Sequence, residues 1–506
     1  MMEIRRDFYL EKLIKRKGNG LIKVISGIRR CGKSYLLNTI FYNHLLDSGV
    51  EKDHIIRFAF DSATDLQLIG ESPIRIEKER RGVDPEKFLA FIQSQIKDEG
   101  TYYLLLDEIQ LLDCFEAVLN SYLRNANLDV FVTGSNAKFL SKDIATEFGG
   151  RGDEVHMYPL SFAEFMTVYN GHYYDGWNEY ITYGGIPIVV LADTDEQKMA
   201  LLDNLFKETY IRDIVVRNKI RNVGEMEMLL NILSSAIGSL TNPNKLQKTF
   251  KSVNQSKITA TTITKYIEYL EDSFLIEEAK RFDIRGKSYI GTPMKYYFMD
   301  MGLRNARLNF RQMEVTHSME NVIYNELRKR GYSVDVGNIM IVEPGKNGKT
   351  VKKQLEVDFV CSKGSKKYYI QSAYSLETEE KMIQEIRPFT KINDFFKKIG
   401  IGAGRARTAM IVGGGTIAYY LARRLLEVGI HTKIIDQDPA RCEHLSELLP
   451  KASIICGDGT DERLLIQEGL ENVDAFAALT GLDEENILLS LYAKRTSHAK
   501  VVTKIN

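Results

Sequence analysis

The residues Val24-Ile25-Ser26-Gly27-Ile28-Arg29-Arg30-Cys31-Gly32-Lys33-Ser34 contain the pattern G-x-x-x-x-G-K-S. An apolar run from Leu21 to Ile25 precedes the pattern, and apolar residues at helical spacing follow it from Tyr35 to Phe41. Strand, glycine loop and helix in this order form the context in which the pattern binds phosphate. We therefore predict a loop whose backbone N–H groups and helix N-terminus receive phosphate oxygens.

Each polar residue of this loop has an expected role. Lys33 is expected to reach the β- and γ-phosphates of a nucleotide, and the Ser34 hydroxyl is expected to bind Mg²⁺. For Cys31 we favour a small filler residue over a redox switch, because thiol reactivity depends on exposure. The predicted nucleotide contacts of this stretch are Gly27, Arg30, Cys31, Gly32, Lys33, Ser34 and Tyr35.

The stretch Tyr102-Tyr103-Leu104-Leu105-Leu106-Asp107-Glu108 predicts a buried parallel strand that ends in two acids. Ligands of open α/β sheets bind at the carboxyl ends of the strands. We expect Asp107 to hold Mg²⁺, directly or through water, and Glu108 to polarise the attacking water. The alternative is a strand that merely ends in two solvated acids.

Two further residues are candidates for catalysis. A strand-like stretch from Asp129 to Thr133 is followed by small polar residues, among them Asn136, which would sense the γ-phosphate or position water. Arg151 follows a glycine-rich segment and would contact phosphate in the same chain or in a neighbouring copy. A plain surface arginine is the alternative for Arg151.

Together these stretches resemble the AAA-type ATPases of prokaryotes that carry a C-terminal DUF4143 region. The resemblance implies ATP and Mg²⁺ as ligands and ATP hydrolysis as the activity, and we expect a homo-oligomer. It extends to about residue 398 and rests on Gly27–Ser34, Leu106–Gln110, Val132–Asn136, Gly150-Arg151, Tyr158–Phe165, Tyr183–Pro187 and Tyr297–Arg304.

Residues 236–305 predict a winged helix. Ile263, Tyr266, Ile267 and Leu270 lie at helical spacing and predict one buried helix face. No acidic residue occurs between Thr241 and Ile267, so lysines of this segment would neutralise DNA phosphates. A solvated lysine-rich face that only mediates domain contacts is the alternative. The lysines concerned are Lys245, Lys248, Lys251, Lys257 and Lys265.

Residues 306–398 resemble the core of the PD-(D/E)xK nucleases. Glu320 on a predicted helix and Asp358 on a predicted strand match two of its acids. The last motif reads Gln371-Ser372-Ala373, so one carboxylate and the lysine that aids the attacking water are missing. We predict a related fold without nuclease activity.

A second nucleotide site is predicted after a small-residue linker at 399–407. Thr408 to Val412 is strand-like, the next residues fit G-x-G-x-x-A, and Asp436 ends the following strand. An acid at this position binds the hydroxyls of adenosine ribose. The predicted contacts with NAD(H) or ATP are Gly413, Gly415, Thr416, Ile417, Ala418, Asp436, Asp458 and Thr480.

Residues 403–506 resemble the N-terminal half of an RCK domain, as found in the TrkA-type subunits of bacterial potassium uptake. The resemblance rests on Ile454–Asp461, Asp474–Thr480 and Asp483–Asn486. It implies an NAD(H)- or ATP-responsive switch whose partner is the membrane subunit of a potassium transporter. A natural fusion and an artificial join both fit this pairing of domains.

Composition sets limits on the whole chain. The 506 residues carry a formal net charge of zero, so any contact with nucleic acid or membrane must be local. The five cysteines form no CxxC pair and are interpreted as reduced thiols. No apolar run approaches the length of a membrane span. We expect a cytoplasmic protein without direct membrane insertion, which reaches the inner face of the membrane only through a partner.

The predicted fold class is therefore α/β and multidomain. A P-loop AAA-type ATPase with a helical lid occupies 1–235, followed by a winged helix (236–305), a nuclease-like region (306–398), the linker and a Rossmann domain (408–506). The primary functional hypothesis is a Mg²⁺-dependent ATPase joined to a nucleotide-binding domain. The alternatives are a non-catalytic regulator of potassium uptake and a DNA-tethered interaction protein.

Overall fold

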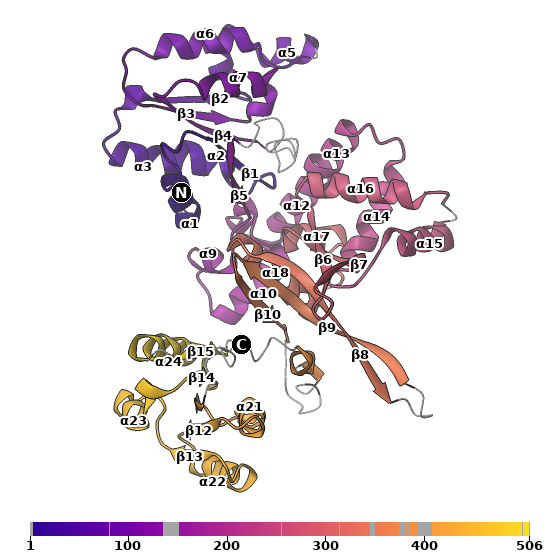
Figure 1. Ribbon diagram of the computed structural model, residues 1–506. Helices are drawn as coiled ribbons and strands as arrows, with labels where there is room; N and C mark the ends of the chain where they lie inside the picture. Colours follow the sequence, from indigo (N-terminus) through magenta and orange to yellow (C-terminus); the bar gives the residue numbers. More distant parts are fainter. Residues whose placement is uncertain are drawn as a thin grey trace. The chain divides into compact units, whose positions relative to one another are not determined.

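The computed structural model divides the chain into two compact units, Met1–Glu385 and Ile386–Asn506, which are described separately (Figure 1). The residues that the structure describes are 4–79, 81–134, 151–254, 256–312, 314–344, 350–373, 381, 384–385, 387–392, 407–497 and 499–504.

The first unit begins with a five-stranded parallel sheet of order β2-β3-β4-β1-β5. Alternate residues of the central strands contribute to two different cores, one on each face. In β1, Ile25 packs into one core while Ile22 and Val24 pack into the other. This burial on both faces explains the continuous apolar runs of the sequence. The strands are β1 (Ile22–Gly27), β2 (Ile55–Ala59), β3 (Tyr102–Asp107), β4 (Leu128–Thr133) and β5 (Gly152–Met157).

Helices cover both faces of this sheet. The helix after the glycine loop is continuous from Lys33 to Asp47, with a π-helical turn at Leu36–Phe41 between α2 and α3. Short 3₁₀ turns occur at Lys52–His54 and Ile109–Leu111. The helices are α1 (Asp7–Ile14), α2 (Lys33–Tyr35), α3 (Tyr42–Asp47), α4 (Ala63–Leu68), α5 (Pro73–Glu79), α6 (Pro85–Gln95) and α7 (Phe115–Tyr122).

A helical region follows β5 and shares a core with the sheet. One cluster of buried residues runs from Tyr9 through Ile25 and Phe131 to Leu230, Ile267 and Leu303, so the two regions are not separated by solvent. The predicted buried face of Ile263, Tyr266, Ile267 and Leu270 is confirmed in α16. The helices are α9 (Phe162–Met166), α10 (Tyr173–Tyr183), α11 (Pro187–Val190), α12 (Asp195–Asn204), a π-helical segment Leu205–Ile211, α13 (Arg212–Arg217), α14 (Val223–Ser235), α15 (Pro243–Asn254), α16 (Ala260–Asp272) and α17 (Met301–Arg307).

A second sheet of order β10-β9-β8-β6-β7 completes the first unit. Its strands pair antiparallel, except for the parallel pair of β6 and β8. Tyr324 of α18 (Val315–Lys329) stacks on Tyr297 and shares a core with Phe359. The strands are β6 (Ile276–Asp283), β7 (Ser288–Phe298), β8 (Ser333–Pro344), β9 (Thr350–Lys363) and β10 (Lys366–Ile370).

The second unit is a doubly wound parallel sheet of order β13-β12-β11-β14-β15 with a separate core on each face. The strand order reverses beside β11, which is the switch point where such sheets bind ligands. A 3₁₀ turn at Phe389–Lys391 precedes this sheet, and another lies at Leu470–Asn472. The elements are β11 (Thr408–Val412), α21 (Thr416–Glu427), β12 (His431–Asp436), α22 (Pro439–Leu448), β13 (Ser453–Cys456), α23 (Glu462–Gln467), β14 (Ala475–Ala478), α24 (Asp483–Thr496) and β15 (Lys500–Thr503).

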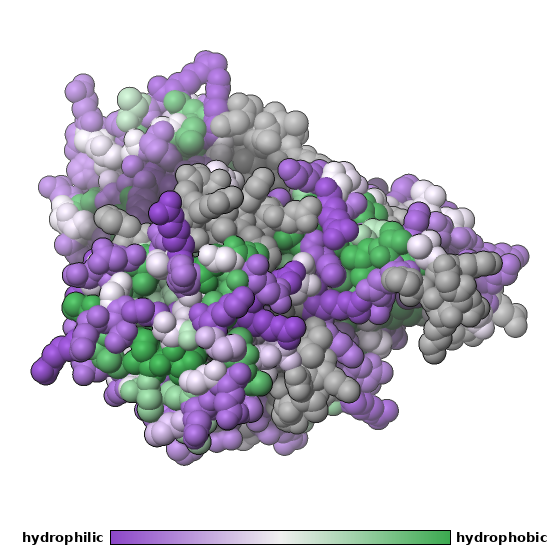
Figure 2. Space-filling model, turned by 60° about the horizontal axis from the view of Figure 1, so that its bottom comes forward, coloured by the Kyte–Doolittle hydropathy of each residue, from purple (hydrophilic) through white to green (hydrophobic). Residues whose placement is uncertain are grey.

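The face shown in Figure 2 carries many hydrophilic side chains, with hydrophobic patches between them. Among the residues that the structure describes, none belongs to a helix with the length and apolarity needed to span a membrane. The second unit leaves several large apolar side chains exposed on or beside α24, namely Leu482, Ile487, Leu488 and Leu491.

Candidate nucleotide sites

The glycine loop of the first unit requires glycine for steric reasons. Gly27 ends β1 with φ of 138°, and a Cβ atom there would lie 2.1 Å from the carbonyl oxygen of Met157. Gly32 also has a positive φ, 99°, immediately before α2 begins. These conformations turn the chain sharply between strand and helix, as a phosphate-binding loop requires.

Lys33 lies inside this loop. Its side chain is buried, and Nζ donates to the carbonyl oxygens of Gly27 at 2.9 Å and Ile28 at 3.1 Å. The ammonium group is therefore held over the turn by two neutral acceptors. Phosphate oxygens are charged acceptors and would form stronger bonds with it.

Ser34 and Asp107 lie together as the sequence predicted for a magnesium site. The Ser34 hydroxyl donates to Asp107 Oδ1 at 3.1 Å, and Thr133 Oγ1 donates to the same oxygen. Burial raises the pKa of Asp107, while the hydrogen bonds from Thr133 and Ser34 oppose the rise. A carboxylate and a hydroxyl in contact are suitable oxygen ligands for Mg²⁺.

Asn38 is a contact of Asp107 that the sequence analysis missed. Its Nδ2 donates to Asp107 Oδ2 at 3.2 Å, so both carboxylate oxygens are held. The sequence feature that could have predicted this contact is the position of Asn38 four residues after Ser34, because residues at this spacing lie on one helix face.

Glu108 follows Asp107 in a left-handed conformation with φ of 53°. Its N–H donates to Thr133 Oγ1 at 3.1 Å, and Gln110 Nε2 donates to its carboxylate. Burial and the charge of Glu108 raise the pKa of Asp61, an acid that the sequence analysis also missed. The position of Asp61 follows from register, because β2 ends opposite Asp107 and Asp61 continues to the same edge.

Arg151 lies at the opposite edge of the sheet from the glycine loop. Its carbonyl accepts from the N–H of Ile22, at the start of β1, and the next residue, Gly152, pairs with Ile22. The loop begins five residues later, about 16 Å away at the rise of a strand. The structure therefore does not bring Arg151 to the loop of its own chain, and a contact in a neighbouring copy stays a prediction.

The remaining predicted residues of the loop have different environments. Cys31 is fully buried, with Sγ donating to the carbonyl of Met157 at 3.5 Å, which fits a filler residue. Arg30 and Tyr35 are exposed beside the loop. Asn136 lies outside the described residues.

A buried arginine that the sequence analysis did not identify supports the loop from beneath. Arg6 is 2% exposed, and its guanidinium donates to the carbonyls of Cys31 at 3.2 Å and Tyr158 at 2.6 Å. It also pairs with Glu164 at 3.3 Å. Glu164 pairs in turn with Lys329 of α18 at 2.8 Å. A continuous polar network therefore joins the glycine loop to the helix of the second sheet.

Two sequence stretches of the resemblance pack against each other. The carboxylate of Asp300 accepts from the N–H of Gly185 at 2.7 Å. A Cβ atom on Gly184 would lie 2.2 Å from Asp300, and one on Gly302 would lie 2.0 Å from the carbonyl of Tyr183. These motifs join α10 to α17 and are structural. Burial raises the pKa of Asp300 to about 6, although backbone N–H groups oppose the rise.

The acids of the nuclease-like region are held by internal donors. Glu320 Oε1 accepts from Lys295 Nζ at 2.8 Å and from the Tyr297 hydroxyl at 2.5 Å. Asp358 accepts from both the N–H and the hydroxyl of Ser372, at 2.8 Å and 2.7 Å. Burial and the charge of Glu320 raise the pKa of Asp358 to about 6. Lys295 also pairs with Glu356 at 2.7 Å.

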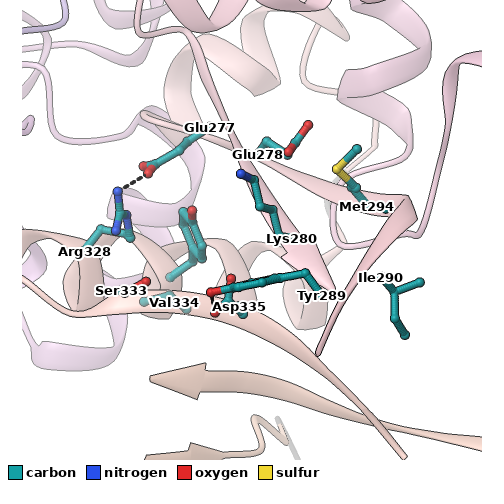
Figure 3. A pocket seen from close by; sticks show the side chains of 12 residues that line it. Glu277, Glu278, Lys280, Tyr289, Ile290, Met294, Arg328, Ser333, Val334 and Asp335 are labelled. Atoms are coloured by element: carbon teal, nitrogen blue, oxygen red, sulfur yellow. Dashed lines mark hydrogen bonds and ion pairs between the residues drawn. The ribbon is translucent and has the colours of Figure 1, made fainter. Parts of the chain in front are cut away.

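A pocket of about 600 Å³ lies between β6, β7, α18 and β8 (Figure 3). Charges of both signs line it. Arg328 pairs with Glu277 at 2.5 Å, and the Tyr289 hydroxyl donates to Asp335 at 3.2 Å. The lining carries the acids Glu277, Glu278 and Asp335 together with the cations Lys280 and Arg328, so it does not present charge of a single sign.

The lysine-rich segment lies at the surface. Lys245, Lys248 and Lys251 are exposed on α15, Lys265 is exposed on α16, and Lys257 is exposed just before α16. This arrangement leaves the positive charges accessible to solvent and to an anionic partner.

The glycine turn of the second unit closes against the neighbouring strand. Gly413 has φ of 94°, and a Cβ atom there would lie 2.6 Å from the backbone of Leu479. Gly415 precedes α21, which begins at Thr416; Ile417 and the buried Ala418 lie in its first turn. The helix N-terminus therefore faces the carboxyl edge of the sheet, as a pyrophosphate site requires.

Asp436 lies at the same edge and is held from three sides. Its Oδ2 accepts from the N–H of Gly414 at 2.5 Å, and Oδ1 accepts from the N–H of Asp438 at 2.9 Å. Arg441 of α22 pairs with it at 3.3 Å. The carboxylate is thus fixed beside the glycine turn, where adenosine ribose would bind.

Asp458 and Thr480 also follow strands that end at this edge. Asp458 comes two residues after β13 and accepts from the N–H and hydroxyl of Thr460, and these bonds lower its pKa. Thr480 comes two residues after β14, and its N–H donates to Asn486 at 2.8 Å. The structure thus brings all eight predicted residues of this site to one edge.

Three stretches of the chain match known protein families. Residues 19–166 match an AAA domain, residues 174–314 match a domain of unknown function (DUF8612), and residues 409–506 match a TrkA-N domain. The middle match is to DUF8612, where the sequence resemblance led us to expect a DUF4143 region. The chain is therefore a multidomain α/β protein with an AAA domain and a Rossmann-like nucleotide-binding domain.

Two relatives cover most of the chain. An uncharacterized protein of Haemophilus influenzae is 33% identical over 402 residues, which are 78% of this chain and 92% of that protein. The uncharacterized protein MJ1544 of Methanocaldococcus jannaschii is 31% identical over 404 residues, 77% of this chain and 81% of that protein. The chain belongs to the same family as these two uncharacterized proteins.

The C-terminal unit has its own relatives. The Trk system potassium uptake protein TrkA of Vibrio alginolyticus is 44% identical over 99 residues. The match covers 20% of this chain and 21% of TrkA, so it extends to one domain of that protein.

Proposed function

We propose that the first unit is a Mg²⁺-dependent ATPase. The observation that supports this most strongly is the contact of Ser34 with Asp107 beside the buried Lys33, at the carboxyl edge of a parallel sheet. Lys33 would bind the β- and γ-phosphates, and Ser34 and Asp107 would hold the metal. Bound Mg²⁺ would neutralise charge on the phosphates.

The residue that we assign to the water is Glu108. Its backbone N–H is held by Thr133, and burial together with the charge of Glu108 raises the pKa of Asp61. A carboxylate at this edge can accept a proton from a water molecule, or it can orient that water molecule for attack on the γ-phosphate.

Two substitutions test this proposal. Lys33→Ala should abolish the ATP binding of the first unit in calorimetry, with the exposed Lys52→Ala as the matched control. Glu108→Gln should keep ATP binding but lose phosphate release, with the exposed Glu99→Gln as its control. Undiminished ATP affinity of Lys33→Ala would rule out this site. Undiminished turnover of Glu108→Gln would favour a non-catalytic nucleotide sensor.

We further propose that the second unit binds NAD(H) or ATP at Gly413–Ala418 and Asp436. Support comes from the glycine turn, the helix N-terminus and the fixed acid at the switch point. Asp436→Ala should lower affinity for NADH without changing ATP binding at Lys33. Equal NADH affinity in the two proteins would refute the assignment of Asp436.

Regulation of potassium uptake is the second candidate function. The specific observation in its favour is the similarity of residues 409–506 to the TrkA-N domain. In this proposal the protein is cytoplasmic, and the second unit contacts the membrane subunit of a potassium transporter. Pull-down of that subunit should then require the second unit and respond to NADH.

Two further partners are proposed. The exposed apolar residues of α24, such as Leu488 and Leu491, support a homo-oligomer, and light scattering of Leu488→Glu with Leu491→Glu tests it. The exposed lysines of α15 and α16 support contact with DNA phosphates.

The nuclease-like region is proposed to be inactive. Glu320 and Asp358 already accept hydrogen bonds from Lys295, Tyr297 and Ser372. Within the described residues, no group of three or more His, Cys, Asp or Glu side chains is arranged to hold a metal. Cleavage of DNA with Mg²⁺ or Mn²⁺ that is lost in Asp358→Ala would refute this proposal.

A further inference from the structure

Two of the five cysteines lie together at the nucleotide edge of the second unit. Cys442 is in the first turn of α22 and is buried, whereas Cys456 is the last residue of β13 and is exposed. Cys456 pairs in sheet register with Asp436, the last residue of β12. The Cys442 thiol packs against the ends of these two strands, and the neighbouring Cys456 contributes to the rise in its pKa.

The same thiol contacts the backbone of the site. Cys442 Sγ lies 3.2 Å from the carbonyl oxygen of Asp436, to which it donates, and 3.9 Å from that of Ile455. The residue before it, Arg441, pairs with the Asp436 carboxylate. Any movement of Cys442 therefore reaches both the backbone and the carboxylate of the acid expected to bind ribose.

The two thiols differ in accessibility. Burial, with the neighbouring Cys456, raises the pKa of Cys442 to about 11, so this group stays a thiol at neutral pH. Cys456 faces solvent and is the sulfur that a small reagent can reach. A reactive thiol needs this kind of access, and a second thiol close to it can resolve the adduct.

We propose that Cys442 and Cys456 form a reversible disulfide with low-molecular-weight disulfides such as oxidised glutathione, and that this bond weakens nucleotide binding at Asp436. The second part rests on the proposed function of this unit. Disulfides of proteins in reducing compartments are typically transient and redox-sensing. A reversible bridge is therefore compatible with the interpretation of the cysteines as reduced thiols.

The exchange balances in two steps. The Cys456 thiolate attacks one sulfur of the small disulfide, the disulfide's S–S bond breaks, and one small thiolate leaves. Cys442 then gives its proton to water and attacks the sulfur of Cys456, and the second small thiolate leaves. Two protein thiols are oxidised, and one small disulfide is reduced to two thiols.

The effect on the site follows from the contacts. Bond formation removes the S–H donor from the Asp436 carbonyl and draws the first turn of α22, with Arg441, toward the end of β13. Loss or distortion of one such hydrogen bond corresponds to a decrease in affinity of about tenfold.

The experiment uses the full chain, reduced and then treated with oxidised glutathione at graded ratios to reduced glutathione. Peptide mass analysis identifies the linkage, and calorimetry measures NADH and ATP affinity before and after treatment. Cys456→Ser should form no bridge and show no response. Cys442→Ser should stop at a glutathione adduct on Cys456. Cys114→Ser, which lacks the exposed cysteine of the first unit, should respond like the wild type.

A Cys442–Cys456 peptide together with a roughly tenfold weaker nucleotide affinity, restored by dithiothreitol, is the expected result. Only a glutathione adduct on Cys456, or a bridge that leaves affinity unchanged, would overturn the proposal. Failure of the reduced protein to bind NADH or ATP in this unit would instead refute the proposed function of the site, and with it the effect on affinity.

Discussion

Replacement of Arg6 by methionine tests whether the N-terminal helix holds the nucleotide loop. The guanidinium is 2% exposed and makes two hydrogen bonds to carbonyls and one ion pair. Removing one partner of a buried ion pair costs about 3–5 kcal/mol of stability. Glu164 keeps Lys329 as a partner at 2.8 Å, so we expect the low end, about 3 kcal/mol.

The same change should weaken ATP binding. The carbonyl of Cys31 loses its donor, so the loop is no longer held in one conformation. If the free energy lost by the loop is about 1.4 kcal/mol, the dissociation constant rises about tenfold. Thermal or denaturant unfolding measures the first effect, and calorimetry with ATP and Mg²⁺ measures the second.

Arg16→Met is the matched control. Arg16 follows the same helix and pairs with Asp153 of β5 at 2.7 Å, but its side chain is 28% exposed. A pair of this kind contributes about 0–1 kcal/mol. If Arg6→Met lost no more stability than Arg16→Met, and bound ATP equally well, the reasoning from burial and the assignment of Arg6 would both be refuted.

Three further predictions follow from single contacts. Gly27→Ala should destabilise the protein by about 1–3 kcal/mol and abolish ATP binding at the glycine loop of the first unit, because its Cβ would overlap the Met157 carbonyl; unfolding and calorimetry of the purified variant would show this. The folded-state pKa of Asp300 is raised, so its contribution to stability should be present below about pH 4 and be lost as pH rises toward 6; Asp300→Asn should remove that part of the pH dependence of unfolding. Lys248→Ala with Lys251→Ala should weaken DNA binding and reduce the salt dependence measured by fluorescence anisotropy, whereas an equal slope would contradict contact through these lysines.

The elements near the nucleotide sites were predictable because their signals are local. An apolar run predicts a buried strand, and the residues directly after it, such as a glycine or Asp107 and Glu108, are the ones at the carboxyl end of that strand. The strand and its end both lie within about ten residues of sequence. The strand Thr408–Val412 was predicted with the bounds that the structure shows. Register then brings such ends together, because parallel strands share one carboxyl edge.

The supporting contacts were not predictable, because they join residues far apart in sequence. Arg6 donates to the carbonyl of Tyr158, which is 152 residues away. Lys295 donates to Glu320, and this contact depends on a strand order that could not be predicted from the sequence. Arg151 shows the converse. Its glycine-rich context is typical of a phosphate contact, but the parallel pairing of β5 with β1 places it at the amino edge of the sheet.

The position of Arg6 also bears on how the regions of the first unit influence one another. A chain of contacts joins the glycine loop to the start of α9 and the end of α18. Arg6 donates to the Cys31 carbonyl and pairs with Glu164, and Glu164 pairs with Lys329. The charges of Arg6 and Lys329 lower the pKa of Glu164 against the effect of burial, so the carboxylate stays ionised and both pairs persist together. A change in the loop on phosphate binding would alter the Cys31 carbonyl and reach α18 through two fixed pairs. We therefore infer that, if the glycine loop binds ATP as proposed, the contacts of α18 would respond to occupancy of the loop through Arg6 and Glu164.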